Sequence, residues 1–252
     1  MQIFIFIIGT IIGSFLNVCI YRIPREESIV FPSSHCPNCS TPLKWYELIP
    51  VLSFTFQKGK CRYCGDPISP QYPLVELLNG FLYLILFKHL GGSLSFIFYA
   101  IIFSILIVIS VIDFDFQIIP DSLSISIFIL AIIYKILQYT LYGISPQIFN
   151  STLALIISSG LFLLIAILSK GGMGGGDIKL IGALGFILGI KLSLLNIFLS
   201  FILGAIISIF LLLFKIKEKK DPIPFGPFIC IAFMIVTLWG EKLIWWYMNL
   251  YI

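Results

Sequence analysis

Charged residues are scarce in this sequence. Only 11% of its 252 residues are charged and 59% are hydrophobic, with a mean hydropathy of +1.07. A soluble domain carries about 25% charged and about 45–50% apolar residues, so the composition argues against a soluble protein. The net charge of +4 comes with no basic stripe long enough to follow a phosphate backbone, which argues against a nucleic-acid-binding protein.

Histidine is nearly absent as well, since His35 and His89 are the two in the chain. This argues against Ser–His or Cys–His nucleophilic catalysis. The N-terminal apolar run also lacks basic residues before it, and Arg22 and Arg25 follow it instead. A secretory signal peptide has a positive n-region, so we expect a retained anchor whose C-terminal end faces the cytoplasm.

Long apolar segments are what the sequence does contain. A helix that crosses a bilayer needs about 20 such residues. One segment is short and rich in glycine, and it could be tilted or re-entrant. The sequence predicts an all-α polytopic membrane protein of about eight helices, at residues 2–21, 73–90, 94–112, 118–142, 149–169, 178–191, 193–214 and 224–249.

Lysine and arginine are distributed unevenly between the predicted loops. Three, Lys88, Lys191 and Lys242, fall near one side of the membrane, and Lys135 lies within a span. By the positive-inside rule, the side with more of them is cytoplasmic, including the polar insert 22–72. The twelve on that side are Arg22, Arg25, Lys44, Lys58, Lys60, Arg62, Lys170, Lys179, Lys215, Lys217, Lys219 and Lys220.

Two aspartates stand at the edges of predicted spans. Asp113 ends the third span in SVIDFDFQIIPDS, and Asp177 opens the sixth in GGMGGGDIKLIGALG. An even number of crossings separates them, so we expect both at the cytoplasmic face. Two adjacent carboxylates share one proton, so the ionised one can activate water while the protonated one donates to a peptide carbonyl. Acids at the membrane edge can also relay ions, so a proton- or cation-coupled transporter is an alternative.

Glycines precede Asp177 in unusual number. The residues are Gly171, Gly172, Gly174, Gly175 and Gly176. A loop without side chains lets an extended substrate backbone approach closely, and Gly174 and Gly176 are predicted to serve this purpose. The alternative is a flexible loop in which Asp177 is a helix N-cap.

These motifs resemble those of a known family. Gly174 to Asp177 reads as the G-x-G-D signature of the GxGD membrane aspartyl proteases. Type IV prepilin leader peptidases are similar in three further places, which are DIKLIGALGFILG, the ending Ile112-Asp113-x5-Ile119-Pro120-Asp121, and IPFGPF at 223–228. The resemblance implies that Asp113 and Asp177 are the catalytic pair. Asp121 is expected to cap the next helix after Pro120, and Asp115 to be a solvated loop residue.

Four cysteines of the insert form two close pairs. Cys36-Pro-Asn-Cys39 and Cys61-Arg-Tyr-Cys64 are 21 residues apart, a spacing typical of a tetrahedral structural zinc site. The cytoplasm is reducing, which disfavours disulfides, and a metal can stabilise an insert with little core. Redox-active pairs are the alternative. Cys19 and Cys230 lie within spans and are expected to pack as small apolar side chains, and we expect His35 at the surface.

The N-terminal region resembles that of the bifunctional leader peptidases. GSFLNVCIYRIPREESIVFPSSHCPNC and SPQYPLVELLNG are the similar segments. The resemblance implies methylation of the new N-terminal amine with S-adenosylmethionine. No Gly-rich nucleotide motif is visible, so the cofactor-binding residues are unassigned. Glu76, just inside the second span, is a candidate to bind an amine or a sulfonium, and pairing with an arginine is its alternative; Asn17, Arg22 and Arg25 are no better placed.

The resemblance also implies the organisation and the substrates. Residues 1–90 would be the anchor, four-cysteine insert and second helix of a methyltransferase region, and residues 91–252 a membrane-embedded aspartyl peptidase domain. Prepilin and pseudopilin precursors would be cut after a glycine at the cytoplasmic face of the bacterial inner membrane. Besides the transporter, a membrane scaffold with a zinc docking module and a signal-peptide-peptidase-like or archaeal preflagellin enzyme stay open; the cysteine insert favours the bacterial bifunctional type.

Overall fold

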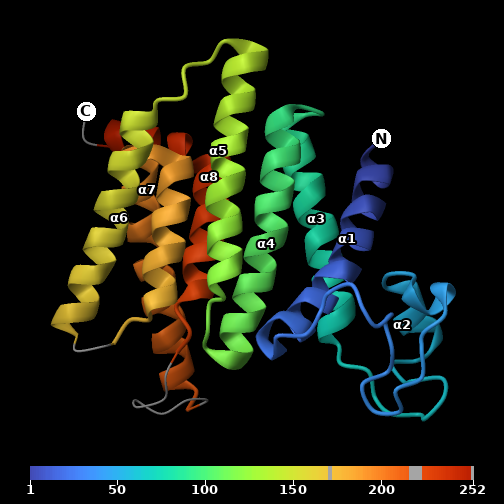
Figure 1. Cartoon of the computed structure of the whole chain (residues 1–252). Coiled ribbons are helices and arrows are strands. Elements are labelled where there is room, and N and C mark those ends of the chain that lie inside the picture. Colours follow the sequence, from blue (N-terminus) through green and yellow to red (C-terminus); the bar gives the residue numbers. More distant parts are fainter. Residues whose placement is uncertain (170–171, 216–222, 251–252) are drawn as a thin grey trace. The chain divides into compact units, whose positions relative to one another are not determined.

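The computed structural model describes residues 1–169, 172–215 and 223–250 (Figure 1). Every regular element within these ranges is helical, apart from two isolated bridges in the insert. Seven of the described helices are long and apolar enough to cross a membrane. The predicted all-α polytopic fold with an insert after the first helix is therefore confirmed. Lys170, Gly171, Lys217, Lys219 and Lys220 lie outside the described residues.

The chain forms two compact units, Met1–Val108 and Ile109–Ile252. The first contains the long helices α1 (Gln2–Arg22) and α3 (Gln71–Leu90) and the first part of α4 (Leu94–Phe116). Between α1 and α3 the chain forms the insert, whose short elements are η1 (Ile23–Arg25), η2 (Trp45–Leu48) and α2 (Leu52–Phe56).

Helices α1 and α3 approach each other closely because small residues face the contact. A Cβ built on Gly9 would lie 2.8 Å from Cα of Gly80, and one on Gly13 would lie 2.7 Å from Cα of Glu76. Such close approach is a common device for packing helices in membranes. Asn79 adds a hydrogen bond of 2.7 Å from its Nδ2 to the carbonyl oxygen of Gly9. This pair of helices supports the insert.

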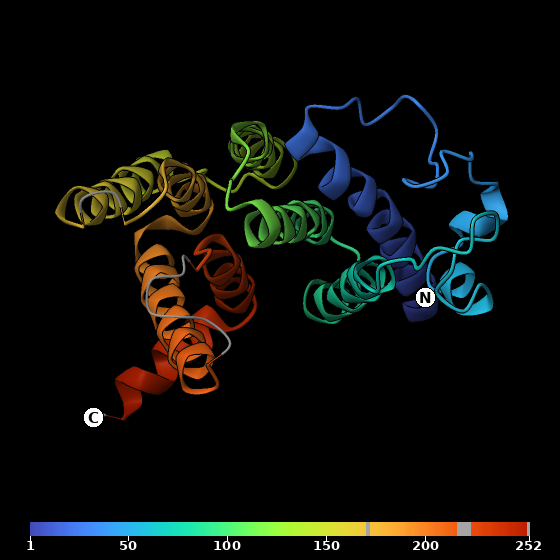
Figure 2. The same cartoon turned by 90° about the horizontal axis from the view of Figure 1, so that it is seen from below.

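The second unit contains the end of α4 and four further elements. They are α5 (Asp121–Tyr142), α6 (Ile148–Leu168), α7 (Gly175–Leu213) and α8 (Gly226–Asn249). Helix α7 packs against α5, α6 and α8. In Figure 2 one arm of α7 is seen beside α6 and the other beside α8. Both parts of α7 are thus covered by neighbouring helices.

Helix α7 is broken at Gly189, whose backbone has φ +74° and ψ 173°. A straight helix of its 39 residues would be about 58 Å long, roughly twice the hydrocarbon thickness of a bilayer. The break frees the backbone N–H of Ile190, which donates to Oδ1 of Asn150 on α6 at 3.3 Å. Both ends of α7 lie at the same end of the bundle in Figure 1, so the two arms form a helical hairpin.

The two arms of α7 correspond to the predicted spans 178–191 and 193–214. The first arm, residues 175–188, is about 21 Å long, which agrees with the short sixth span predicted from the sequence. Its close contact with α6 comes from Gly185, where a Cβ would lie 2.9 Å from Oγ of Ser158. The hydroxyls of Ser158 and Ser193 are also hydrogen-bonded to each other. These small and polar contacts hold the hairpin against α6.

Candidate functional site

Asp113 lies near the end of α4, and the residue is only 6% exposed. Its Oδ2 accepts a hydrogen bond of 2.9 Å from the backbone N–H of Gly226. Gly226 is the first residue of α8, and the first N–H groups of a helix have no partner within the helix. The N-terminus of α8 therefore supplies both a donor and a partial positive charge to Asp113.

Asp177 occupies the first turn of α7 and is 8% exposed. The backbone N–H of Gly174 donates to its Oδ2 at 3.2 Å. The other oxygen, Oδ1, is buried and has no hydrogen-bond partner among the described residues. A buried oxygen without a donor costs free energy, so Oδ1 is free to accept a hydrogen bond from a water molecule or from a substrate.

The two carboxylates belong to the same unit and lie close enough for their charges to interact. Ile119, in the connection from α4 to α5, packs against the start of α7, which carries Asp177, and against the start of α8, which binds Asp113. A Cβ built on Gly176 would lie 2.8 Å from Cβ of Ile119, and one on Gly226 would lie 3.1 Å from its Cδ1. The starts of α7 and α8 thus meet at one apolar side chain, and the hydrogen bond from Gly226 joins the start of α8 to the end of α4.

This arrangement suits acid–base chemistry on a peptide bond. Each aspartate has one oxygen held by a backbone N–H at a helix start, which orients the side chain. Two adjacent carboxylates in a site with little water favour sharing one proton over carrying two charges. Such a pair holds both an acid and a base, which is what the hydrolysis of an amide requires.

The two neighbouring aspartates lie outside this pair. Asp115 is exposed, as predicted, but it lies in the last turn of α4 and not in a loop. Asp121 was predicted to be the N-cap of its helix, and this is wrong, because Pro120 is the N-cap and Asp121 is the first helical residue. Its Oδ2 instead accepts from Nζ of Lys179 at 2.6 Å in an exposed ion pair. That ion pair joins the starts of α5 and α7.

The glycines before Asp177 differ in their surroundings. Gly176 packs against Ile119 too closely for any side chain, whereas a Cβ on Gly175 would meet nothing within 4 Å among the described residues. A Cβ on Gly174 would meet only Oδ2 of Asp177, at 3.3 Å. Gly176 is therefore explained by packing. The approach of a substrate backbone along Gly174 and Gly176 stays a prediction.

The four cysteines of the insert come together in space. Their sulfur atoms all lie within 4.8 Å of one another, and Sγ of Cys36 is 3.9 Å from Sγ of Cys64. A tetrahedral ion with sulfur ligands at about 2.3 Å requires sulfurs about 3.8 Å apart. The cluster could therefore hold a metal ion.

Each cysteine pair forms the same kind of turn. The N–H of Ser40 donates to the carbonyl oxygen of Cys36 at 2.9 Å, and the N–H of Gly65 donates to that of Cys61 at 2.9 Å. Ser40 and Gly65 both have positive φ, at 55° and 78°. The repeated turn directs both thiols of each pair to one point, as expected for metal ligands.

The thiols of the cluster do not ionise alike. Hydrogen bonds with the side chain and backbone of Thr41 lower the pKa of Cys39 to about 6. A hydrogen bond with the backbone of Cys64 likewise lowers the pKa of Cys61. The backbone of Asp66 favours the thiolate of Cys64, but burial and the other thiols outweigh this effect and raise its pKa to about 12. Part of the cluster is thus ready to bind a cation as thiolate at neutral pH.

Glu76 lies on α3 and is 7% exposed. Its Oε2 accepts from the backbone N–H of Val51 at 2.7 Å, and the Ser14 hydroxyl also binds its carboxylate. Val51 has φ +62°, a strained conformation for a β-branched residue, and α2 begins directly after it. Glu76 therefore anchors the start of α2. Its role toward a cofactor stays a prediction.

The other residues weighed for this region also have structural partners. Nδ2 of Asn17 donates to the carbonyl oxygen of Tyr72 at 3.1 Å. Arg22 is buried and donates to the carbonyl oxygens of Ser28 and Pro32 at 3.0 and 2.7 Å. Arg25 stacks on Tyr21, with Cζ 4.0 Å from the ring centroid. Cys19 and Cys230 are buried within helices, as predicted.

Sequence reasoning missed two residues of the aspartate site. Gly226 lies in the IPFGPF motif, but nothing in its local pattern indicates that its N–H binds a carboxylate 113 positions away. Ile119 lies in the motif Ile112-Asp113-x5-Ile119-Pro120-Asp121, but the motif assigns no contact to it. Both residues act where distant segments of the chain meet. That meeting occurs only in the folded protein, so no local sequence pattern indicates it.

Comparisons with known proteins agree with these features. A family profile described as "Type IV leader peptidase family" matches residues 100–209, and one described as "Bacterial Peptidase A24 N-terminal domain" matches residues 7–90. No solved structure shows a significant match.

Three curated relatives, each named "Prepilin leader peptidase/N-methyltransferase", are similar over nearly their full length. The one from Bacillus subtilis is 39% identical over 98% of this chain and 97% of its own. The relative from Legionella pneumophila is 33% identical over 94% of this chain and 91% of its own. The relative from Aeromonas hydrophila is 31% identical over 97% of this chain and 93% of its own.

Proposed function

This chain belongs to the type IV leader peptidase family, and from that membership we propose that it cleaves the leader peptides of prepilins and pilin-like proteins and methylates the new N-terminal residue. The observation that carries the peptidase half is the pair Asp113 and Asp177. Both are buried, both are held by backbone N–H groups, and their charges interact. An ion-coupled transporter finds no support among the relatives.

In the proposed reaction the aspartates act as a general acid–base pair. The ionised carboxylate takes a proton from a water molecule, and the hydroxide attacks the carbonyl carbon of the scissile bond. The protonated carboxyl donates to the carbonyl oxygen, which becomes the second hydroxyl of the tetrahedral intermediate. When the C–N bond breaks, the leaving amine takes a proton from the dyad, and one hydroxyl of the intermediate returns its proton to the dyad as the C=O bond re-forms. Oδ1 of Asp177, which has no partner among the described residues, is a suitable acceptor for the water.

The position of the pair at helix ends fits a substrate cut at the membrane surface. We propose that the aspartates face the cytoplasm in the bacterial inner membrane, where the positive-inside rule also holds a basic leader. The hydrophobic helix of the substrate would stay in the bilayer, so its scissile bond would lie at the depth of the two carboxylates. The peptidase domain in this proposal is residues 91–252.

For the methyltransferase half we propose residues 1–90. Zinc bound by Cys36, Cys39, Cys61 and Cys64 would hold the insert together, because so short a segment buries little apolar surface. S-adenosylmethionine would supply an activated methyl group for the new amine. The support for zinc is the compact cluster of four thiols, and the support for methylation is the name of the relatives.

The proposal is tested by incubating purified protein with a prepilin and labelled S-adenosylmethionine, then weighing the product by mass spectrometry. Loss of the leader mass with gain of one methyl group supports both halves. An intact precursor under conditions in which a known relative cleaves it would exclude the peptidase, and a scaffold function would then become the better interpretation.

A further inference from the structure

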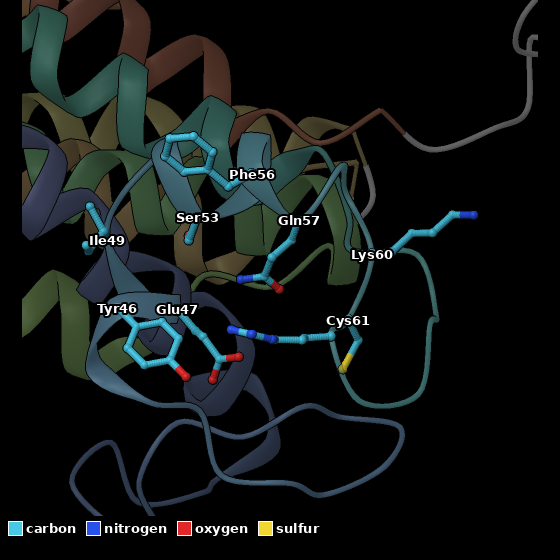
Figure 3. A pocket seen from close by; sticks show the side chains of 9 residues that line it. Tyr46, Glu47, Ile49, Ser53, Phe56, Gln57, Lys60 and Cys61 are labelled. Atoms are coloured by element: carbon cyan, nitrogen blue, oxygen red, sulfur yellow. The ribbon is translucent and has the colours of Figure 1, made fainter.

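A cavity of about 450 Å³ lies in the insert, between η2 and α2. Tyr46 and Glu47 of η2 line one part of it, and Ser53 of α2 lines another (Figure 3). Cys61 and Arg62 of the second cysteine turn complete the lining. Its volume falls in the range of small-molecule sites, about 300–1,000 Å³. It lies within the first unit, and neither Asp113 nor Asp177 lines it.

Glu47 is the unusual residue of this cavity. It is 7% exposed, and its Oε2 accepts from the backbone N–H of Lys44 at 2.8 Å and from the hydroxyl of Tyr63 at 3.3 Å. Its Oε1 is buried without a partner among the described residues. An unsatisfied carboxylate oxygen is costly. The terminal torsion of glutamate is soft, so a small rotation can turn this oxygen toward a donor in the cavity.

The cavity also offers positive charge and aromatic surface. Lys60 and Arg62 both line it, and Cζ of Arg62 lies 5.9 Å from the ring centroid of Tyr46. Gln57, whose side chain points toward the same space as Ser53 in Figure 3, offers one donor and one acceptor group. A ligand that fits this lining carries a hydroxyl or ammonium for Glu47, a carboxylate for Arg62 and a flat polar ring.

We infer that this cavity binds the adenosyl amino acid that donates the methyl group, S-adenosylmethionine. Glu47 accepts a hydrogen bond from its ammonium or ribose, Arg62 pairs with its carboxylate, and Tyr46 offers a π-face to its sulfonium or adenine. The inference rests on the proposed methyltransferase function and adds the residues that recognise the donor. Glu76 positions the wall formed by α2, through the N–H of Val51.

This assignment links the cysteine cluster to the donor. Cys61 is both a member of the cluster and a residue of the cavity wall, and Arg62 follows it directly. Loss of the metal would therefore displace both the guanidinium of Arg62 and the part of the cavity wall that Cys61 forms. The aspartate pair, which lies in the other unit, does not contribute to this cavity.

The test measures equilibrium binding of tritiated S-adenosylmethionine to the full-length, zinc-loaded protein in detergent. Wild type is expected to bind saturably. Glu47→Gln keeps the side-chain volume and the acceptor for Lys44, and is expected to weaken binding at least about tenfold. Ser53→Leu fills the cavity from the opposite wall and is expected to do the same without touching Glu47. Glu27→Gln, an exposed glutamate of the same insert, removes an equal charge and should bind like wild type.

Zinc content and melting temperature show that each variant is folded, and methylation of a cleaved pilin by wild type is measured in parallel. If both cavity variants bind like wild type while wild type methylates, the cavity assignment is wrong and the proposed function stands. If wild type cuts the leader but neither binds the donor nor methylates, the assignment and the methyltransferase half both fail.

Discussion

The backbone N–H of Gly226 donates a hydrogen bond of 2.9 Å to Oδ2 of Asp113. This bond joins the start of α8 to the end of α4, and it leaves no room at Gly226, where a Cβ would lie 2.7 Å from the same oxygen. The glycine and the aspartate are therefore required together. The aspartate site is built as much from backbone groups at helix starts as from its two acids.

Substitution of Gly226 tests this contact directly. Gly226→Ala is expected to displace the carboxylate of Asp113 and to lower the rate of leader cleavage by about 10²-fold, the usual effect of misplacing a reacting group by about 1 Å. Gly160→Ala is the matched control, because a Cβ there meets nothing within 4 Å among the described residues. Cleavage rates of a prepilin by the purified variants are compared. Equal rates for the two alanine variants would contradict the proposed role.

The aspartate pair is tested by isosteric amides. Asp113→Asn and Asp177→Asn are each expected to abolish cleavage, a loss of at least about 10²–10⁴-fold, because a neutral amide cannot share the proton. Asp121→Asn breaks only an exposed ion pair with Lys179, and such pairs contribute little, so it should cleave within about threefold of wild type. The rate of leader cleavage is measured from the change in mobility of the prepilin on a denaturing gel. Processing by either dyad variant at a near wild-type rate would refute the pair.

The sequence predicted much of this architecture because its signals are local. Apolar runs of helical length and the Cys-x2-Cys spacing each lie within a short stretch, and the spans and the cysteine cluster followed from them. The aspartates depended on counting crossings and on resemblance to a family. Gly226, Ile119 and Glu47 could not be found in this way, because their roles come from segments that meet only after folding. The break at Gly189 was seen only as a short, glycine-rich span.

Removal of the cysteine cluster should affect the two activities unequally. Wild type is expected to contain roughly one zinc ion per chain, and replacing Cys36 and Cys39 by Ser is expected to lower this zinc content. The double substitution should impair methylation more than proteolysis, because the aspartates lie in the other unit. Cys19→Ser, within α1, is the control and should keep its zinc. Zinc content is measured by inductively coupled plasma mass spectrometry, and both activities are assayed on the same samples. Equal loss of both activities would mean that the insert supports the whole fold.

The affinity of the cysteine cluster for zinc should decrease as the pH falls. Zinc binds thiolates, so protons compete with it and its affinity falls as the pH falls. The Cys39 thiol, with its pKa lowered to about 6 by Thr41, binds zinc without losing a proton above that pH. The decline in affinity is expected to steepen below about pH 6.

Competition with a chelator across pH measures this dependence. Thr41→Val removes the side-chain hydrogen bond and should move the steep region to higher pH. An unchanged profile in that variant would show that Thr41 does not control the ionisation of Cys39.

Two substitutions of Glu76 separate a positioning role from a direct cofactor contact. Glu76→Gln keeps an oxygen for the N–H of Val51, whereas Glu76→Ala leaves that N–H without its acceptor, at a cost of about 1–3 kcal/mol. If Glu76 positions α2, the glutamine variant should methylate near the wild-type rate and the alanine variant at least about tenfold more slowly. If its charge binds the sulfonium, both variants should lose methylation equally. Rates of methyl transfer to a cleaved pilin decide between the two.

Ile119 packs against both Gly176 and Gly226, the first next to Asp177 and the second bonded to Asp113, so its size bears on the separation of the two acids. A smaller side chain there would let the two helix starts drift together, and a larger one would wedge them apart. An aliphatic residue that takes no part in the chemistry is therefore expected to limit the rate of cleavage, because either displacement moves the acids away from their reacting positions.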